Sequence, residues 1–239
     1  RDYVGDVVSG DKEIDYLKVL GERSPGNLDL SPVRLVFNGA EPISVELCEE
    51  FLARLAGLGL RRNAMLPVYG LAEASLAVSF PPVGRPLLTL QLNRHKLGVG
   101  EQAEVLREAN RDALSLVSVG KAIPLCEMRI AGDDDRALPD GRVGHIHIRG
   151  ANVTSGYFRE PEVNAVTITA DGWLKTGDLG LVLNGETYIT GRAKEILFVN
   201  GQNYYPHDLE MILQGEQGLE HGKVAAAGVR NPDAPADEL

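Results

Sequence analysis

The sequence has few cysteines, few aromatic residues and no excess of basic residues. Its 239 residues include two cysteines and one tryptophan, aromatic residues make up 5%, and the formal net charge at pH 7 is -10. Cys48 and Cys126 lie too far apart to form a metal-ligand motif, and two cysteines exclude a disulfide-rich scaffold. We therefore expect two reduced core residues and a cytoplasmic protein. The acidic balance argues against binding of nucleic acid through its phosphates.

Long apolar runs and the pattern of a signal peptide are also not seen in the sequence. The sequence contains no stretch of about 18 apolar residues, so no membrane span is predicted. Arg1 to Tyr3 show neither an initiating methionine nor the basic-then-apolar pattern of a signal peptide, so we expect the chain to begin inside a longer protein. Hydrophobic residues make up 44% and charged residues 24%, which is typical of a globular protein with a substantial core.

The stretch Asp171–Arg192 predicts a β-hairpin. Two β-prone runs flank Asn184-Gly185, and this arrangement is the strongest short-range hairpin signal in a sequence. Folding the chain at this turn places Asp178 across from Gly191 and Arg192. A carboxylate there can accept hydrogen bonds from two neighbouring hydroxyls, and a guanidinium can hold oxyanions in a fork. The pair predicts a binding rim; the alternative is a surface salt bridge that closes the hairpin.

Two strand–turn–helix patterns in the first 85 residues predict an α/β sheet region. A predicted strand over 33–37 runs into a glycine-containing turn, and Ser44 caps a predicted helix over 45–56. A second predicted strand over 65–68 leads through Tyr69-Gly70 into a predicted helix over 74–79. Open α/β sheets bind ligands at such strand ends, so the second pattern places Tyr69 and Glu73 at one cleft.

Tyr69 and Glu73 have chemical roles available in such a cleft. An aromatic ring can cover the face of a purine. A carboxylate beside phosphate oxygens makes chemical sense when it holds a divalent cation, because the two groups otherwise repel each other. The alternatives are a core tyrosine and an exposed helix residue.

The middle of the chain predicts an insertion followed by a small barrel. Residues 87–116 include the charged stretch 101–108, and the simplest interpretation of this segment is a solvated surface insertion. From 117 to 191, short predicted strands alternate with turns, which is typical of a small barrel. His145 and His147 share one face of a predicted strand, with Ile146 and Ile148 on the other face. We therefore expect outward histidines rather than a metal pair.

The character of the sequence changes after Arg192. A predicted strand over 196–199, the turn Asn200-Gly201, a predicted helix over 207–213 and a predicted strand over 223–229 follow one another. This order predicts the start of a second, smaller α+β unit.

Several of these segments resemble the adenylate-forming superfamily of acyl-AMP and acyl-CoA synthetases, the AMP-binding enzymes. The matching segments are Asn38-Gly39-Ala40-Glu41-Pro42, Tyr69-Gly70-Leu71-Ala72-Glu73, Ser118–Pro124, Gly172–Gly180 and Ile189–Glu210. Residues 87–116 resemble the insertion that separates fatty acyl-AMP ligases from acyl-CoA ligases, and Ala72 stands where many relatives carry Thr. The resemblance implies a large domain over 1–191, with an α/β part over about 1–85, the insertion over about 87–116 and a distorted barrel over about 117–191. The beginning of a small mobile α+β domain would follow over 192–239.

The resemblance also implies a site for ATP or AMP with Mg²⁺. It implies that Tyr69 stacks on adenine, that Glu73 holds Mg²⁺, that Asp178 takes the ribose hydroxyls and that Arg192 contacts ribose or phosphate. Glu73 and Arg192 would be the catalytic residues, and Lys194 would be the pivot between the domains. The remaining residues implied at the adenine side are Gly39, Ala40, Glu41, Gly70 and Ala72.

The reaction implied by the resemblance has two steps. A fatty or other carboxylic acid attacks the α-phosphate of ATP and displaces pyrophosphate, and a phosphopantetheine thiol on a carrier protein then takes the acyl group. No phosphate loop ending in Pro-Lys precedes Leu35, and the chain stops before a C-terminal catalytic lysine. We therefore expect a central-to-C-terminal fragment that makes no acyl-AMP alone. The alternatives are an acyl-CoA ligase, a peptide-synthetase adenylation domain or, in another class, a non-catalytic nucleotide-binding or carrier-docking module.

Overall fold

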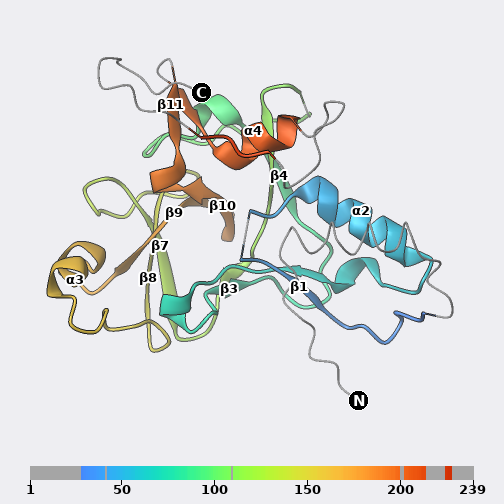
Figure 1. Cartoon of the computed structure of the whole chain (residues 1–239), viewed down its shortest axis with the longest axis horizontal. Helices are drawn as coiled ribbons and strands as arrows, with labels where there is room; N and C mark the ends of the chain where they lie inside the picture. The colour runs from blue at the N-terminus through green and yellow to red at the C-terminus, as the bar shows by residue number, and fades with distance from the viewer. Residues whose placement is uncertain (1–27, 41, 109, 200–201, 214–223, 228–239) are drawn as a thin grey trace.

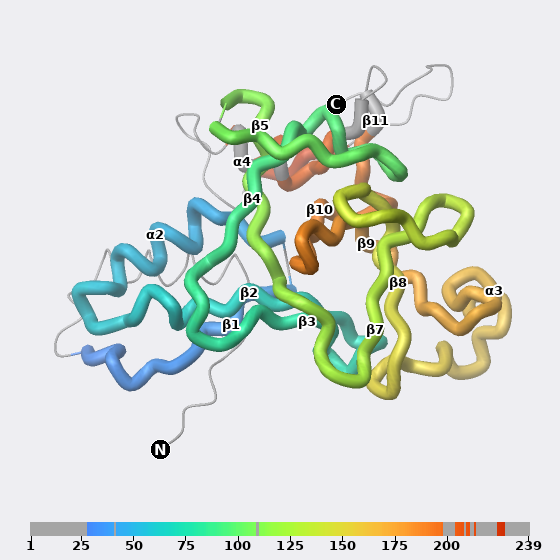
Figure 2. Tube along the Cα trace, turned by 180° about the vertical axis from the view of Figure 1, so that it is seen from behind, coloured from blue at the N-terminus to red at the C-terminus, as the bar shows by residue number. Residues whose placement is uncertain are grey.

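The computed structural model describes residues 28–40, 42–108, 110–199, 202–213 and 224–227 (Figures 1 and 2). In Figure 1, helix α2 and strand β1 lie on one side of the molecule, and strands β7, β8 and β9 lie on the other. Helix α4 lies above the gap between these two parts. No helix in the described part of the chain is long and apolar enough to cross a membrane.

The α/β part contains a parallel strand pair and one long helix. Strand β1 (Val36–Asn38) pairs with β2 (Met65–Pro67), and helix α2 (Val45–Ala56) with the 3₁₀ turn η1 (Arg62–Ala64) lies between them in the chain. The predicted helix over 45–56 is confirmed, and the Ser44 hydroxyl caps it by accepting a hydrogen bond from the Leu47 N–H at 3.1 Å. The buried face of α2 consists of Cys48, Phe51, Leu52 and Leu55.

The predicted helix over 74–79 is wrong. Only the 3₁₀ turn η2 (Ala72–Ala74) forms there, and Ser75 and Leu76 then adopt left-handed backbone angles with φ of 50° and 71°. The chain instead turns back on Gly70, so closely that an added Cβ there would lie 1.6 Å from the Leu76 oxygen. Strand β3 (Ser79–Phe80) follows, and Tyr69 exchanges two backbone hydrogen bonds with Ser79.

Residues 87–116 form a packed hairpin, so the interpretation as a solvated surface segment is wrong for its strands. Strand β4 (Thr89–Asn93) pairs antiparallel with β5 (Ala113–Val117), and the 3₁₀ turn η3 (Arg94–Lys96) follows β4. Leu92 and Leu114 on these strands are buried against Leu179 and Leu181 of a distant hairpin. Within the stretch 101–108, Ala103 joins this cluster and most of the neighbouring side chains are exposed.

The predicted barrel does not close among the described residues, which form an open four-stranded antiparallel sheet instead. The sheet has the order β10-β9-β8-β7, and a short strand, β6, pairs with β3 outside it. The outer edge of β10 is occupied by residues 118–120, which exchange backbone hydrogen bonds with Thr187, so it is not available to β7. The elements of this region are β6 (Lys121–Ala122), β7 (Cys126–Ala131), β8 (Gly144–Gly150), α3 (Pro161–Thr167), β9 (Leu174–Leu183) and β10 (Glu186–Arg192).

The expectation of two outward histidines on β8 is wrong for His147. Ile146 and Ile148 face the core as predicted, but His147 is also fully buried, and its Nε2 lies 3.7 Å from Asp135 Oδ1. The pairing of β8 with β9 shifts its register between His145 and His147, so simple alternation does not hold there. Within the described residues no group of three or more metal-ligating side chains could hold an ion.

A small unit follows the 3₁₀ turn η4 (Ala193–Glu195). Strand β11 (Leu197–Val199) and helix α4 (Pro206–Leu213) match the predicted strand and helix, whereas β12 (Gln202–Tyr204), which pairs with β11, was not predicted. The predicted turn Asn200-Gly201 lies outside the described residues. The strand predicted over 223–229 is not found at residues 224–227, and its other residues lie outside the described part of the chain. Tyr205 ties this unit to the rest of the protein, since its buried hydroxyl lies 3.3 Å from both the Leu97 oxygen and Thr190 Oγ1.

Candidate functional site

The predicted hairpin forms between β9 and β10. Asn184 and Gly185 both have positive φ, 54° and 75°, as the tight two-residue turn requires. Asp178 lies opposite Arg192, which confirms the predicted pairing, and Gly191 lies opposite Leu179. A register shift between Ile189 and Gly191 marks a bulge just before this end of the hairpin.

Asp178 makes contacts with both of its carboxylate oxygens. Its Oδ1 lies 3.2 Å from Arg192 Nε, and its Oδ2 accepts a hydrogen bond of 2.6 Å from the Tyr69 hydroxyl. Asp178 is 7% exposed, whereas the Arg192 side chain is 54% exposed. The Asp178 carboxylate is therefore largely buried, whereas the Arg192 guanidinium extends toward solvent.

Burial governs the ionisation of this pair. Desolvation raises the pKa of Asp178, and the hydrogen bond from Tyr69 and the charge of Arg192 oppose that rise. Burial raises the pKa of Tyr69 well above its usual range, and the adjacent Asp178 carboxylate raises it further. The Tyr69 hydroxyl is therefore protonated at neutral pH and acts as the donor in this bond.

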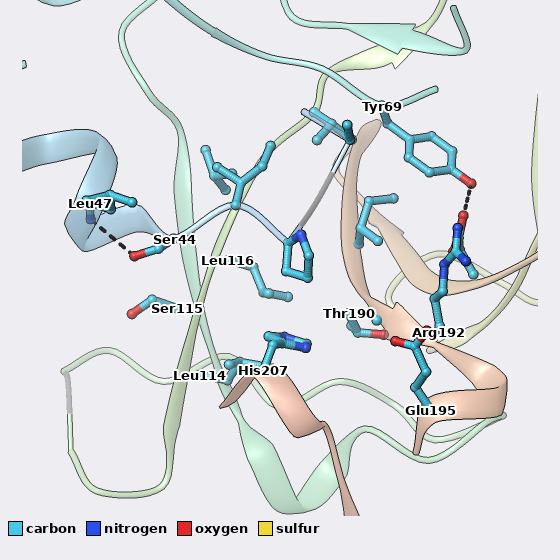
Figure 3. Close-up of a pocket in the computed structure, with 18 of the residues that line it drawn as sticks. Ser44, Leu47, Tyr69, Leu114, Ser115, Leu116, Thr190, Arg192, Glu195 and His207 are labelled. Carbon is cyan, nitrogen blue, oxygen red and sulfur yellow. Dashed lines mark hydrogen bonds and ion pairs between the residues drawn. The ribbon is translucent and has the colours of Figure 1, made fainter. Parts of the chain in front are cut away.

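These three side chains line a cavity of about 500 Å³. Its walls come from distant parts of the chain: the segment before α2, the loop after β2, strand β5, the open end of the β9–β10 hairpin, and α4. Figure 3 shows Tyr69 and Arg192 on one side of the cavity and Ser44, Leu114 and His207 on the other. Cavities of roughly 300–1,000 Å³ with apolar walls and a few polar groups are the usual size for small-molecule sites.

The cavity brings together only some of the predicted site residues. Its lining includes five of them, Ala40, Tyr69, Gly70, Asp178 and Arg192. Three others, Gly39, Ala72 and Glu73, are not part of the lining that the described residues form, and Glu41 lies outside the described residues. Lys194 is exposed on η4, next to Glu195, which does line the cavity.

Two of the residues outside the lining have structural partners. An added Cβ on Gly39 would lie 2.8 Å from both the side chain and the backbone oxygen of Val68, so this glycine permits close packing of neighbouring segments. Glu73 Oε1 accepts a hydrogen bond of 2.7 Å from the Tyr157 hydroxyl. A single carboxylate of this kind suits Mg²⁺, which binds through one or two carboxylates together with substrate phosphates.

The sequence prediction missed residues that the cavity takes from β5 and α4. Ser115 and Leu116 come from the predicted insertion, and His207 and Glu210 come from the predicted second unit. Alternating apolar residues at 113–117 were a signal for a strand, but no local pattern indicates which cavity that strand will line. Burial lowers the pKa of His207, so its imidazole faces the cavity in the neutral form.

Comparisons with known proteins agree with the resemblance of the motifs. The family model described as AMP-binding enzyme matches residues 10–158. A putative acyl-CoA synthetase of Caulobacter vibrioides is 37% identical over 89% of this chain and 37% of its own length. A long-chain-fatty-acid–AMP ligase, FadD32, of Mycolicibacterium smegmatis is 35% identical over 94% of this chain and 38% of its own length.

A solved structure has the same fold. It comes from a study of fatty acyl-adenylate ligases of E. coli and L. pneumophila, and it superposes with a TM-score of 0.81 at 32% identity. The match covers 92% of this chain and 40% of that one, so the chain spans well under half the length of these relatives. From the family model and these similarities we conclude that the chain belongs to the AMP-binding enzyme family.

Proposed function

We propose that the cavity binds the adenylate part of ATP and acyl-AMP, and that the chain is part of an enzyme that activates a fatty or other carboxylic acid. The observation that carries this proposal is the meeting of Tyr69, Asp178 and Arg192 at one cavity of about 500 Å³. These residues come from three of the matching segments, Tyr69 lies more than one hundred positions before the other two, and the resemblance assigned all three to nucleotide contacts.

Asp178 is suited to ribose, because a carboxylate accepts hydrogen bonds from two neighbouring hydroxyls. Arg192 is suited to ribose or phosphate oxygens, since its exposed guanidinium has donors left beyond the Nε contact. Ala40, Val68 and Gly70 also line the cavity, and their apolar surface suits the adenine base. The Tyr69 ring is only 8% exposed, so it offers a small part of its face for stacking.

Glu73 and Lys194 have roles outside the cavity wall in this proposal. Glu73 would hold Mg²⁺, which when bound neutralises charge on the phosphates. Its Oε1 accepts a hydrogen bond from the Tyr157 hydroxyl, and its backbone oxygen accepts one from the Thr154 N–H at 2.7 Å. Lys194 would be the pivot at which the small unit turns relative to the large domain.

The acyl acceptor would be a carrier-protein phosphopantetheine, as the segment 87–116 indicates. This segment packs through Leu92 and Leu114 into the core beneath the cavity, and β5 forms one cavity wall. Relatives of this chain carry both kinds of name, AMP ligase and acyl-CoA synthetase. Thioester formation by the full-length gene product, assayed with coenzyme A and with a carrier protein in parallel, separates these acceptors; faster transfer to coenzyme A would favour the acyl-CoA ligase.

Titration calorimetry of the chain with AMP tests the proposed site. Asp178→Ala should lower AMP affinity at least about tenfold, because hydrogen bonds to a charged group are the strong ones. Asp140→Ala is the matched control, since Asp140 is an exposed acid outside the cavity lining. Equal affinities of the two variants would remove Asp178 from the site, and no AMP binding by the unmutated chain would contradict the proposal.

A pyrophosphate-release assay with ATP and fatty acids tests the proposed enzyme. We expect no turnover by the 239-residue chain alone and turnover by the full-length gene product. Turnover by the chain alone would contradict the first expectation. Binding of AMP without turnover by the full-length product would instead favour a non-catalytic nucleotide-binding module.

A further inference from the structure

We infer that the Tyr69 hydroxyl is a positioning group that orients Asp178 toward two neighbouring ribose hydroxyls. This inference rests on the proposed function of the cavity and adds a role for the hydroxyl that is separate from any contact of the ring with the base.

The hydrogen bond between Tyr69 and Asp178 is short and shielded from water. It measures 2.6 Å and joins side chains that are 8% and 7% exposed. Hydrogen bonds to ionised groups are roughly twice as strong as neutral ones, and low exposure limits competition from water. The loop after β2 and strand β9 are therefore fixed to each other at the cavity wall.

The contacts of Asp178 leave acceptor positions on both oxygens. An ionised carboxylate has about four lone-pair directions, two on each oxygen. Arg192 takes one direction on Oδ1, and Tyr69 takes one on Oδ2. One direction on each oxygen then matches a pair of hydroxyls on neighbouring carbons. Since Tyr69 and Arg192 hold opposite oxygens, they set the rotation of the carboxylate before the ligand arrives.

Core packing does not require the hydroxyl. The Tyr69 ring packs in a cluster with Ala74, Val78 and Val119, and a phenylalanine ring would fill the same space. The hydroxyl, unlike the ring, donates a hydrogen bond to the Asp178 carboxylate, and the Thr176 side chain also contacts it. Tyr69→Phe therefore removes the positioning bond and retains the packed ring.

A double-mutant cycle with adenosine as the probe tests the inference. Tyr69→Phe should weaken adenosine binding about tenfold in calorimetry, and it should weaken 2′-deoxyadenosine binding less. In the Asp178→Ala background, where position 178 has no side-chain acceptor, Tyr69→Phe should have no further effect on adenosine affinity. Tyr188→Phe, a buried tyrosine of β10 outside the cavity lining, is the matched control. An undiminished effect of Tyr69→Phe in the Asp178→Ala background, or no effect in the unmutated chain, would overturn the inference.

A measurement without ligand separates this inference from the proposed function. Carbon NMR of labelled aspartate should show a higher pKa for Asp178 in Tyr69→Phe, because the hydroxyl bond favours the ionised carboxylate. Arg192 and Glu195 also act on Asp178, and His207 and Glu210 line the same cavity, but Tyr69→Phe leaves all four unchanged. An unchanged Asp178 pKa would overturn the positioning role. Failure of the chain to bind adenosine would contradict the proposed function and leave this NMR result to decide the role of the bond.

Discussion

The two ends of the β9–β10 hairpin each hold a carboxylate beside an arginine, but the two pairs are built differently. At the turn end, Arg85 donates to both oxygens of Glu186 at 2.8 and 2.7 Å, and the Ser118 hydroxyl donates at 2.6 Å. At the open end, Asp178 has one contact with Arg192, at 3.2 Å, and one hydrogen bond from Tyr69.

The pKa shifts of the two carboxylates have opposite directions. The hydrogen bonds from Arg85 lower the pKa of Glu186 to about 2, although burial opposes this shift. Burial raises the pKa of Asp178 because its partners only partly compensate for the loss of water. A carboxylate with three strong donors stabilises the fold, whereas one with unused acceptor positions can bind a ligand.

The largest effect should follow from breaking the turn-end pair. Arg85→Met should lower the free energy of unfolding by about 2–3 kcal/mol, because Glu186 then remains largely buried without its cation. Urea denaturation measures this change. Arg62→Met is the control, since Arg62 pairs with Glu49 at the surface and such pairs contribute about 0–1 kcal/mol. Equal losses of unfolding free energy in the two variants would show that the Arg85–Glu186 pair contributes no more than a surface pair.

The pH dependence of stability should separate the two ends. The folded pKa of Glu186, about 2, lies below its ordinary 4.5, so its contribution is fully present above pH 4.5 and is lost as the pH falls toward 2. The raised pKa of Asp178 has the opposite sign: its contribution decreases as the pH rises through the interval between 3.8 and its folded value. Glu186→Gln should therefore flatten the acid decline of stability by about 2–3 kcal/mol in total, and Asp178→Asn should steepen it slightly.

Urea titrations of the three proteins between pH 6 and 3 measure these slopes. Burial lowers the pKa of His147 to about 4, so all three proteins should lose stability alike as the pH falls from 6.5 to 4. Subtracting the stability of the unmutated protein from that of each variant at the same pH removes this shared contribution of His147. Slopes that change in the same direction in both variants would contradict the contrast between the two ends.

The smallest effect should come from the turn that joins the two strands. Gly185→Ala should destabilise the protein by about 1 kcal/mol, because φ is 75° there and an alanine is strained in that region. Its Cβ would make only an ordinary contact, 3.5 Å from Lys121 Nζ, so the cost is that of the backbone alone.

Gly57→Ala provides the control for this turn variant. Its φ is -64° and no atom lies within 4 Å of an added Cβ, so this change should be neutral or stabilising. Thermal denaturation of both variants, with adenosine affinity measured in parallel, checks the prediction. A weaker adenosine affinity in Gly185→Ala would mean that the turn and the open end are coupled more tightly than we expect.

Local patterns predicted the elements whose residues interact mainly with their neighbours in the chain. The helix over 45–56 was predictable because Ser44 caps it and apolar side chains recur at three- and four-residue steps. The hairpin and its pairing of Asp178 with Arg192 were predictable because Asn184-Gly185 selects a turn that sets the register.

Three of the wrong predictions concern positions where contacts outside the local pattern decide the conformation. The stretch after Glu73 has helical composition, yet the close approach of Leu76 to Gly70 forces it into a loop. His147 alternates correctly for an outward residue, yet a register shift and Asp135 bury it. Leu92 and Leu114 were assigned to a surface insertion. Their contacts with Leu179 and Leu181 span more than sixty residues, and no local pattern in the sequence indicates them.

The sequence alone determined the family, the turn of the hairpin and the placement of an acid opposite an arginine, because these depend on residue types at short, definite spacings. Only the tertiary structure decided that Tyr69 donates to Asp178, that β5 and α4 complete the cavity and that Glu73 lies outside its wall. The physical reason is that burial and hydrogen-bond partners depend on which distant segments come into contact. The spacing of residues along the chain does not specify these tertiary contacts.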